Sequence, residues 1–401
     1  MRLLQSVLPT LRQTKKPQQK FVAHRLRLRL MLPGHATFRH LSRYSAYHER
    51  TFARWYARDC DVVSLNKAAI TQVIPPEHEQ ALVLDASCVP KSGQKTYGLD
   101  RFWNGSHSRT EKGLEISTLA WLDMTENCAY GLSVEQTPPT DQTTDSEATR
   151  MAIDRDQLAH VVSEHQLSHR RDVVTDGYYR TQKFTGGVRD LGLEQIGNLR
   201  IDAHRRYLYQ GPKRPGPGRP KTSDGKVHWD DLVRFEHVET DDDEIVLSHQ
   251  VLHHVPYQCN LRVVLVVDTK HHRRAVLLST DVDLDALTIY RYDKARFHIE
   301  CLCRDAKQFT GLTDSQARSP AKRNFHFNAS LSAVTLAKLD ARQPNGDAAS
   351  VFSMASLKRR AFNQHLIERM SQHVAQGHSL EKSSPAYEEL CNYGTITGLA
   401  A

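Results

Sequence analysis

Short apolar runs separated by helical patterns predict a mixed α/β core in the middle of the chain. Four of these runs have the length and composition of buried or half-buried strands: ALVLDAS (81–87), LEISTLAWLD (114–123), AYGLSVEQT (129–137) and DVVTDGYY (172–179). Between the third and fourth runs, an amphipathic pattern with Ser146 as a helix cap predicts a helix over 145–167. A helix through about 190 and a strand at 195–202 follow.

The predicted order is therefore strand, strand, strand, helix, strand, helix, strand. This is the ribonuclease H-like order, an α/β fold in which helices flank a mixed sheet. In such a sheet the first and fourth strands are neighbours. We expect residues 76–209 to form the first part of this core, after a Pro-Pro linker at 72–80.

The segments after the core predict an insertion and then more helix. Residues 210–226 are rich in Pro, Gly and Lys and exclude regular structure. Both a minor-groove DNA contact through Arg219 and a flexible basic loop fit them. Residues 227 to about 282 alternate as strands do, so we expect a β-rich insertion over 210–285. The second part of the core is expected at 286–345.

Three further helices are predicted towards the end of the chain, at 289–308, 324–340 and about 351–374. The C-terminal region, 346–401, should be helical, with its last 20 residues loosely ordered. A loop is expected at QPNGD, and Trp103 and Trp121 are expected in the core.

Residues 1–75 are helical in pattern and basic, and 36–58 have a helix-turn-helix rhythm. A first helix is expected from about Thr37 and a second from near Tyr47. Arg50 and Arg54, with Arg58, lie on one i, i+4 row that could face phosphates. A plain helical hairpin with solvated arginines fits the pattern equally well. Because the first 60 residues hold many Arg and Lys and few acids, we nevertheless expect a helical N-terminal region that binds DNA.

Bulk composition narrows the class of protein. The 401 residues allow two or three domains, and a formal charge of +8 with a pI near 9.1 favours a polyanionic partner. The seven cysteines include no CxxC motif, which favours reduced thiols in the cytoplasm over a disulfide frame or a zinc ribbon. No apolar run approaches 18 residues, and no signal peptide is recognisable at the N-terminus, so no membrane association is expected.

Candidate chemistry lies at the ends of two predicted strands, where Asp85 and Asp176 stand. If the first and fourth strands are neighbours, the two carboxylates lie close together. Two ionised carboxylates at such a short distance repel each other unless a cation lies between them. Oxygen ligands suit Mg²⁺, and a third carboxylate would complete two metal sites about 3.5–4 Å apart.

The helix at 289–308 supplies the candidate third carboxylate, Glu300. Tyr292, Arg296, Glu300 and Lys307 fall within an arc of roughly 80° on one helix face. A solvated face held by i, i+4 ion pairs is the alternative interpretation. Asp305 is a rival carboxylate, but its position in the helix directs it to the far face.

Four segments together resemble the DDE transposases of bacterial insertion sequences, in particular the group with a Tyr-Arg-Glu-Lys signature, the insertion-sequence-four type and its relatives. The resemblance covers roughly 20–340. Its segments are LVLDASCVPKSGQKTYGLDRFWNGSHSRTEKGLEISTLAW, VVTDGYY, LRIDAHRRYLYQGPKRPGPGRPK and RFHIECLCRDAKQFTGL. One departure is that Tyr292 and Arg296 are four residues apart, where the family usually has three.

The resemblance implies that Asp85, Asp176 and Glu300 are catalytic and bind two Mg²⁺ ions, with Mn²⁺ as the alternative ion. It also implies cleavage of double-stranded DNA at element ends, strand transfer of the 3′-OH into a target, and a homodimer in the DNA complex. The expected location is the bacterial cytoplasm, at the nucleoid when DNA is bound. A nuclease of the same fold and a catalytically silent DNA-binding protein remain alternatives.

Several cations are candidates for contacts with DNA. The resemblance gives Arg296 and Lys307 the role of holding phosphates near the cut, and Tyr292 that of contacting a distorted DNA end. Basic residues close to the first aspartate are equally plausible as DNA contacts and as solvated charges: Lys91, Arg109 and Lys112.

Overall fold

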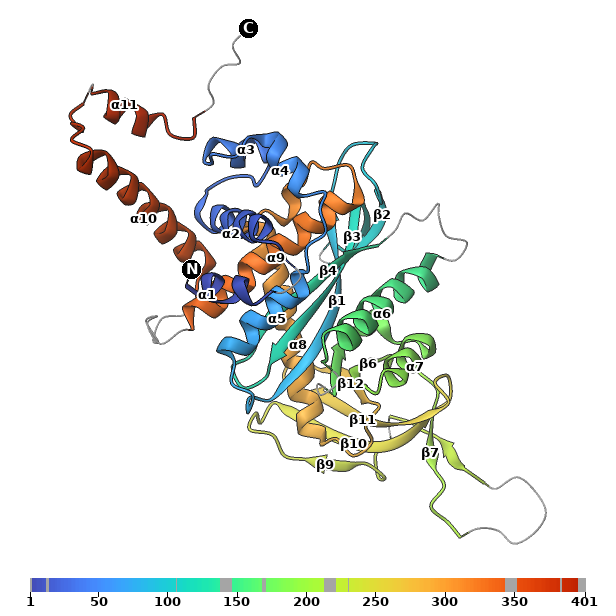
Figure 1. The fold of residues 1–401 in the computed structure, drawn as a ribbon. Coiled ribbons are helices and arrows are strands. Elements are labelled where there is room, and N and C mark those ends of the chain that lie inside the picture. Colours follow the sequence, from blue (N-terminus) through green and yellow to red (C-terminus); the bar gives the residue numbers. More distant parts are fainter. Residues whose placement is uncertain are drawn as a thin grey trace.

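A long mixed sheet with helices on both sides forms the centre of the molecule (Figure 1). This computed structural model describes residues 2–11, 14–105, 107–137, 146–167, 171–212, 221–229, 231–342, 352–382 and 384–395. The predicted loop at QPNGD, residues 343–347, and Arg219 lie outside the described residues.

Five strands form the predicted core and stand in the order β4-β3-β1-β5-β6. They are β1 (Gln80–Pro90), β3 (Arg109–Asp123), β4 (Cys128–Gln136), β5 (Asp172–Thr175) and β6 (Glu194–Leu199). The strands β1 and β3 are antiparallel, as are β3 and β4, whereas β1 is parallel to β5 and β5 to β6. The ribonuclease H-like fold is thus confirmed, including the adjacency of the first and fourth strands of the core.

Alternating side chains of β1 pack into different cores, as expected for a strand buried on both faces. Leu82 and Leu84 join a core with α5 (Val62–Val73), α6 (Ser146–Glu164) and α7 (Gln182–Asp190). On the opposite face, Val83 joins a core with the long helix α8 (Ala286–Phe309). Asp85 has the parity of Val83 and therefore belongs to the face that α8 covers.

The β-rich region extends the same sheet instead of forming a separate one. Beyond β6 follow β12 (Arg273–Ser279), β11 (Cys259–Asp268), β10 (Ile245–His254), β7 (Arg205–Leu208) and β8 (Ser223–Lys226). Figure 1 shows β10, β11 and β12 in yellow as a continuation of the central strands. A small apolar core of its own supports this extension.

One strand prediction in this region is wrong. The sequence 227–238 alternates as a strand does, but among its described residues, 227–229 and 231–238, only β9 (Glu236–Val238) is a strand. The apolar side chains of Val227, Trp229 and Phe235 instead reach into the core of the extension from irregular backbone. The packing of these side chains, and not strand pairing, explains the apolar spacing. The Trp229 indole also donates a hydrogen bond to the Ile201 carbonyl at 2.7 Å.

The N-terminal residues form α1 (Arg2–Val7), α2 (Lys16–Met31), α3 (Phe38–Arg43), α4 (Glu49–Trp55) and α5. The two short helices at 36–58 are confirmed, and Thr37 caps α3 by accepting from the His40 amide at 3.2 Å. These helices share one apolar core with the sheet, partly through Phe325 of α9 (Pro320–Ala341). The division of the chain into domains stays a prediction.

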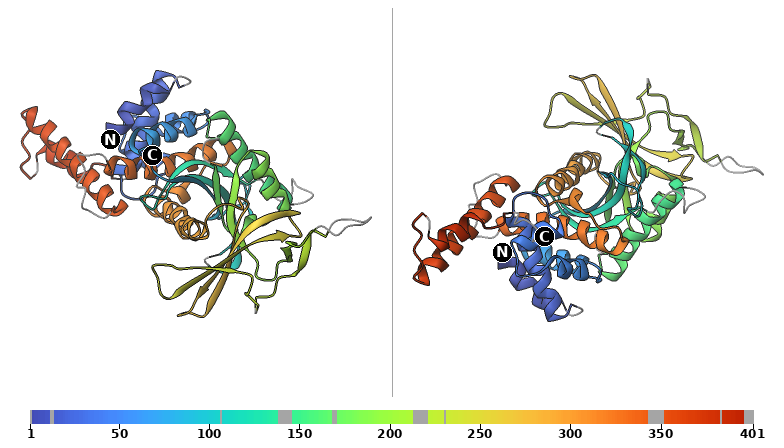
Figure 2. Two further views of the ribbon diagram at one scale, coloured as in Figure 1. Left: turned by 90° about the horizontal axis from the view of Figure 1, so that it is seen from below. Right: turned by 90° about the horizontal axis from the view of Figure 1, so that it is seen from above.

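Two helices end the described chain, α10 (Met354–Ala375) and α11 (Pro385–Cys391). The expectation of loose order in the last 20 residues is wrong for α11, where Ser384 caps the helix and Ala386 is buried. Figures 1 and 2 show α10 projecting from the body. Among the described residues, no helix combines the length and apolar character needed to cross a bilayer.

Close packing of α9 on β4 generates a stability prediction at Gly131. A Cβ built there would lie 2.2 Å from Cδ2 of the buried Leu331. Gly131→Ala should therefore lower the free energy of unfolding by about 1–3 kcal/mol, measured by urea denaturation. Gly186→Ala is the control, since nothing lies within 4 Å of its Cβ position on α7 and the change should stabilise by about 0.5–1 kcal/mol. Equal effects of both changes would contradict the packing argument.

Candidate active site

The two aspartates follow the last paired residues of neighbouring parallel strands. Leu84 of β1 is in register with Thr175 of β5, so the next residue on each strand is Asp85 and Asp176. Neighbouring strands lie about 4.8 Å apart, which places the two backbones side by side at this point. The Asp176 carboxylate also caps the following turn by accepting from the Tyr178 amide at 2.9 Å.

Mutual repulsion and burial disfavour the ionised forms of these aspartates. Burial first, and then the charge of Asp176, raises the pKa of Asp85 to about 7. Burial likewise raises the pKa of Asp176, against the hydrogen bond from Tyr178. The charge of Glu300 acts in the same direction on both, so the three predicted carboxylates lie within electrostatic reach of one another.

Glu300 stands on α8 above these strand ends and is only partly covered. Its side chain is 44% exposed, and its Oε1 accepts from Nη1 of Arg296 at 3.1 Å. The Arg296 guanidinium also lowers the pKa of Asp85 and Asp176, so it partly neutralises the whole group. Within the described residues, no three His, Cys, Asp or Glu side chains converge as a preformed metal shell.

The donor chemistry nevertheless fits a hard divalent cation. Asp85, Asp176 and Glu300 offer only carboxylate oxygens, the ligands that Mg²⁺ and Mn²⁺ take. Two of these groups are half-buried at neighbouring strand ends and repel each other, which is a cost that a cation between them removes. Glu300 would leave its ion pair with Arg296 to join them.

Lys307 contacts the same strand from the next turns of α8. Its Nζ donates to Oγ of Ser87 at 2.8 Å, two residues beyond Asp85 on the same face of β1. The structure thus brings together five of the residues singled out in the sequence: Asp85, Asp176, Arg296, Glu300 and Lys307. Asp305, the rival carboxylate, is buried elsewhere and pairs with Arg304.

Tyr292 does not join this group, and the expectation that it faces DNA is corrected. It is only 4% exposed and lies at the amino ends of the strands, near Glu79 and Asp172. Glu79 precedes β1 and Asp172 begins β5, so the ring is at the opposite end of these strands from Asp85. Along α8 it lies eight residues from Glu300, or about 12 Å. The two residues share one face of the helix, but they are far apart along its axis.

The other predicted DNA contacts occupy three kinds of place. Lys91 donates to the Ser315 carbonyl, and Lys112 donates to the Gly93 carbonyl at 2.9 Å, so both also hold backbone. Arg109 is exposed and forms an ion pair with Glu111 at 2.7 Å. Arg50 and Arg54 are exposed on α4.

Asp154 of α6 is a buried carboxylate near the site that the sequence did not identify as a candidate. Burial raises the pKa of Asp154 to about 7, while the Ser117 and Tyr179 hydroxyls oppose the shift. Charges of Asp154, Asp85 and Asp176 all raise the pKa of the buried Tyr179, so this phenol lies within reach of all three. Asp154 occupies an apolar-face position of an amphipathic helix, which is the one signal that could have identified it.

Trp103 corrects a second expectation, since it is 63% exposed whereas Trp121 is buried as predicted. It lies on β2 (Asp100–Asn104), a strand that the sequence analysis did not predict. Its neighbour Phe102 points inwards and is fully buried. Because side chains alternate along a strand, burying Phe102 leaves Trp103 on the solvent side.

Comparison with known families agrees with this geometry. Residues 39–245, just over half of the chain, match the family model described as DDE superfamily endonuclease. The chain belongs to this family of DNA-acting endonucleases, whose members generally use divalent metals. The match contains Asp85 and Asp176 and ends before Glu300. No curated protein matches the chain.

Burial of Asp154 predicts a pH-dependent stability. Its pKa is raised on folding, so its contribution is present below about pH 4 and is lost as the pH rises through about 7. As the pH rises from about 4 to about 7, the unfolding free energy of Asp154→Asn should therefore increase by up to about 4 kcal/mol relative to that of wild type. The measurement is urea denaturation without metal at a series of pH values. Asp268→Asn is the control: a backbone hydrogen bond from His271 lowers the pKa of Asp268, so its contribution changes below about pH 4 and its difference from wild type should stay nearly constant between pH 4 and 7. A pH-independent difference for Asp154→Asn would contradict the assignment.

Proposed function

We propose that this protein is the transposase of a bacterial insertion sequence, related to the group with the Tyr-Arg-Glu-Lys signature. The observation that carries the proposal is the adjacency of Asp85 and Asp176 on parallel strands, with Glu300 of α8 electrostatically coupled to both. Binding alone does not require three such carboxylates in one place, whereas phosphodiester chemistry with two metals does.

The three carboxylates would hold two divalent cations, with Mg²⁺ the expected ion. When bound, such ions lower the pKa of the attacking water and neutralise charge on the leaving oxygen. In the first reaction, water attacks a phosphorus atom at the element end and the bond to the 3′ oxygen breaks, leaving a 3′-OH. In the second, that 3′-OH attacks a target phosphodiester and displaces a 3′ oxygen of the target.

The cations on α8 orient the DNA in this scheme. Arg296 would exchange its contact with Glu300 for a phosphate if Glu300 served as a metal ligand. Lys307 donates to Ser87, two residues after Asp85 on β1, and from this position it contacts a phosphate of the DNA strand that is cut. The expected substrate is double-stranded DNA, bound by a homodimer that bridges two element ends in the cytoplasm.

Metal-dependent cleavage at the element's own borders tests this proposal. Purified protein is incubated with labelled DNA that carries the inverted repeats flanking its gene, with Mg²⁺ or with a chelator. Border cleavage that leaves a 3′-OH, followed by joining to target DNA, is the expected result. Cleavage without joined product would identify a nuclease of the same fold, and specific binding without cleavage would identify a silent DNA-binding protein.

Variants of the carboxylates should separate chemistry from binding. Asp85→Asn and Glu300→Gln should each lower the cleavage rate at least about a hundredfold, since each removes a metal ligand worth several kcal/mol in the transition state. DNA affinity measured in chelator should not fall. Asp305→Asn, on the far side of α8, is the matched control and should cleave at close to the wild-type rate. Wild-type cleavage by Asp85→Asn would refute the site.

A further inference from the structure

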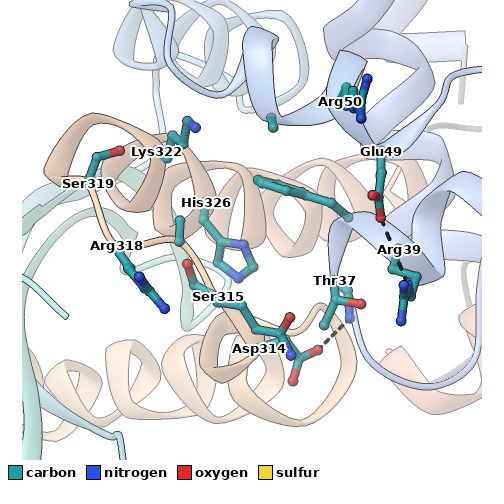
Figure 3. Close-up of a pocket in the computed structure, with 15 residues that line it drawn as sticks. Thr37, Arg39, Glu49, Arg50, Asp314, Ser315, Arg318, Ser319, Lys322 and His326 are labelled. Atoms are coloured by element: carbon teal, nitrogen blue, oxygen red, sulfur yellow. Dashed lines mark hydrogen bonds and ion pairs between the residues drawn. The ribbon is translucent and has the colours of Figure 1, made fainter. Parts of the chain in front are cut away.

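A cavity lies outside the carboxylate site, between the α3–α4 pair and the start of α9 (Figure 3). Its volume is about 650 Å³, within the range of ordinary ligand pockets. One wall comes from α3 and α4, and the other from residues 314–319 and the first turns of α9. Two parts of the chain that are far apart in sequence, one of them the predicted helix-turn-helix, thus meet around one cavity.

The charges that line this cavity leave an excess of positive charge. Arg50, Arg318 and Lys322 line it and form no ion pair with any described residue. The two acids that line it are already engaged. Glu49 pairs with Arg39 at 4.0 Å, and Asp314 accepts from His35 at 2.9 Å and from the Ala36 amide at 2.6 Å.

Buried cations beneath the cavity strengthen this field. His326 lines the cavity, and its Nδ1 lies 3.0 Å from Nη2 of Arg29, a fully buried guanidinium. Arg25 is buried close by, and both of its terminal nitrogens lack a hydrogen-bond partner in the described structure. Cations held in a low-dielectric interior without paired carboxylates favour an anion at the nearest solvent-accessible point.

The start of α9 adds in the same direction. This 22-residue helix begins at the cavity, and its N-cap residue Ser319 makes no side-chain capping hydrogen bond. The free backbone amides and the positive end of the helix dipole therefore face the same space as Lys322 and Arg318.

We propose that this cavity binds a phosphate of the DNA backbone, away from the cut. Its position connects it to the carboxylates, because Lys91 at the end of β1 donates to the carbonyl of the lining residue Ser315. Six residues of extended chain separate Asp85 from Lys91, or about 20 Å. At 3.4 Å per base pair this corresponds to a phosphate about six base pairs from the reacting one. The proposal rests on the proposed function only in taking DNA as the ligand.

The test is a double variant, Arg318→Gln with Lys322→Gln, in which no ion pair of the described structure is lost. Binding of element-end DNA is measured by fluorescence anisotropy in chelator over a series of salt concentrations. Affinity should fall about tenfold or more, and the slope of log affinity against log salt should flatten by about 1–2 units. The control is Arg273→Gln with Arg274→Gln, two exposed cations at the start of β12, which should bind almost as wild type.

Inorganic phosphate serves as a second probe, read as a rise in melting temperature of wild type that the double variant loses and the control keeps. Stabilisation by phosphate with unchanged DNA affinity would overturn the DNA assignment and leave a site for a small phosphate compound. Unchanged behaviour of the double variant with both probes would overturn the cavity altogether. Because binding is measured without metal, a wild type that binds through the cavity but never cleaves DNA would refute the proposed function alone.

Discussion

The parallel pairing of β1 with β5 is the constraint on which the candidate site depends. This short ladder, only three residue pairs long, aligns Leu84 with Thr175 and so delivers Asp85 and Asp176 to the same point. The ladder is made of fully buried residues with apolar neighbours on both faces. Because a shift of one residue would turn apolar side chains out of their cores, the register is strongly fixed, and with it the proximity of two like charges.

Stability of the core therefore offsets an electrostatic cost at its edge. The raised pKa values of Asp85 and Asp176 express that cost, and Arg296 reduces it by standing among the acids. The helix that carries Arg296 also carries Glu300, so the same element supplies a neutralising charge and a further ligand. Divalent cations would neutralise the three carboxylates more fully than Arg296 does and would release Arg296 for a phosphate, which gives a physical reason for finding Arg296 one helical turn before Glu300.

The sequence predicted the parts of this arrangement that depend on local pattern and strand order. The apolar runs at β1 and β5 each end at an aspartate, and the order of strands and helices placed those two runs side by side. Helical periodicity placed Arg296, Glu300 and Lys307 on one face, where the structure has them near Asp85. Periodicity describes direction around a helix axis and not distance along it, which is why Tyr292 was grouped with them although it is buried at the opposite end of the strands.

What could not be predicted depends on contacts between distant segments. The sequence of the β-rich region does not indicate which strand pairs with the central sheet. The pairing of β12 with β6 in the structure shows that the region extends that sheet. Arg25 donates to the Tyr56 hydroxyl, and Arg29 and His326 contact each other and residues near 310–330, so no local pattern indicates that these basic groups are buried.

Burial of these basic groups changes the meaning of the net positive charge. A surplus of Lys and Arg predicts a polyanionic partner, but it does not say which surface the partner meets. Here some of the surplus lies inside the protein, under the cavity between α4 and α9. Arg50, Arg318 and Lys322, which form no ion pair with any described residue, line this cavity. Salt screens buried charges much less than surface charges. The electrostatic field of these buried groups should therefore weaken less at high salt than the field of an exposed basic loop. A DNA strand drawn to this cavity could continue along β1 to the carboxylates, because Lys91 joins the two places through Ser315.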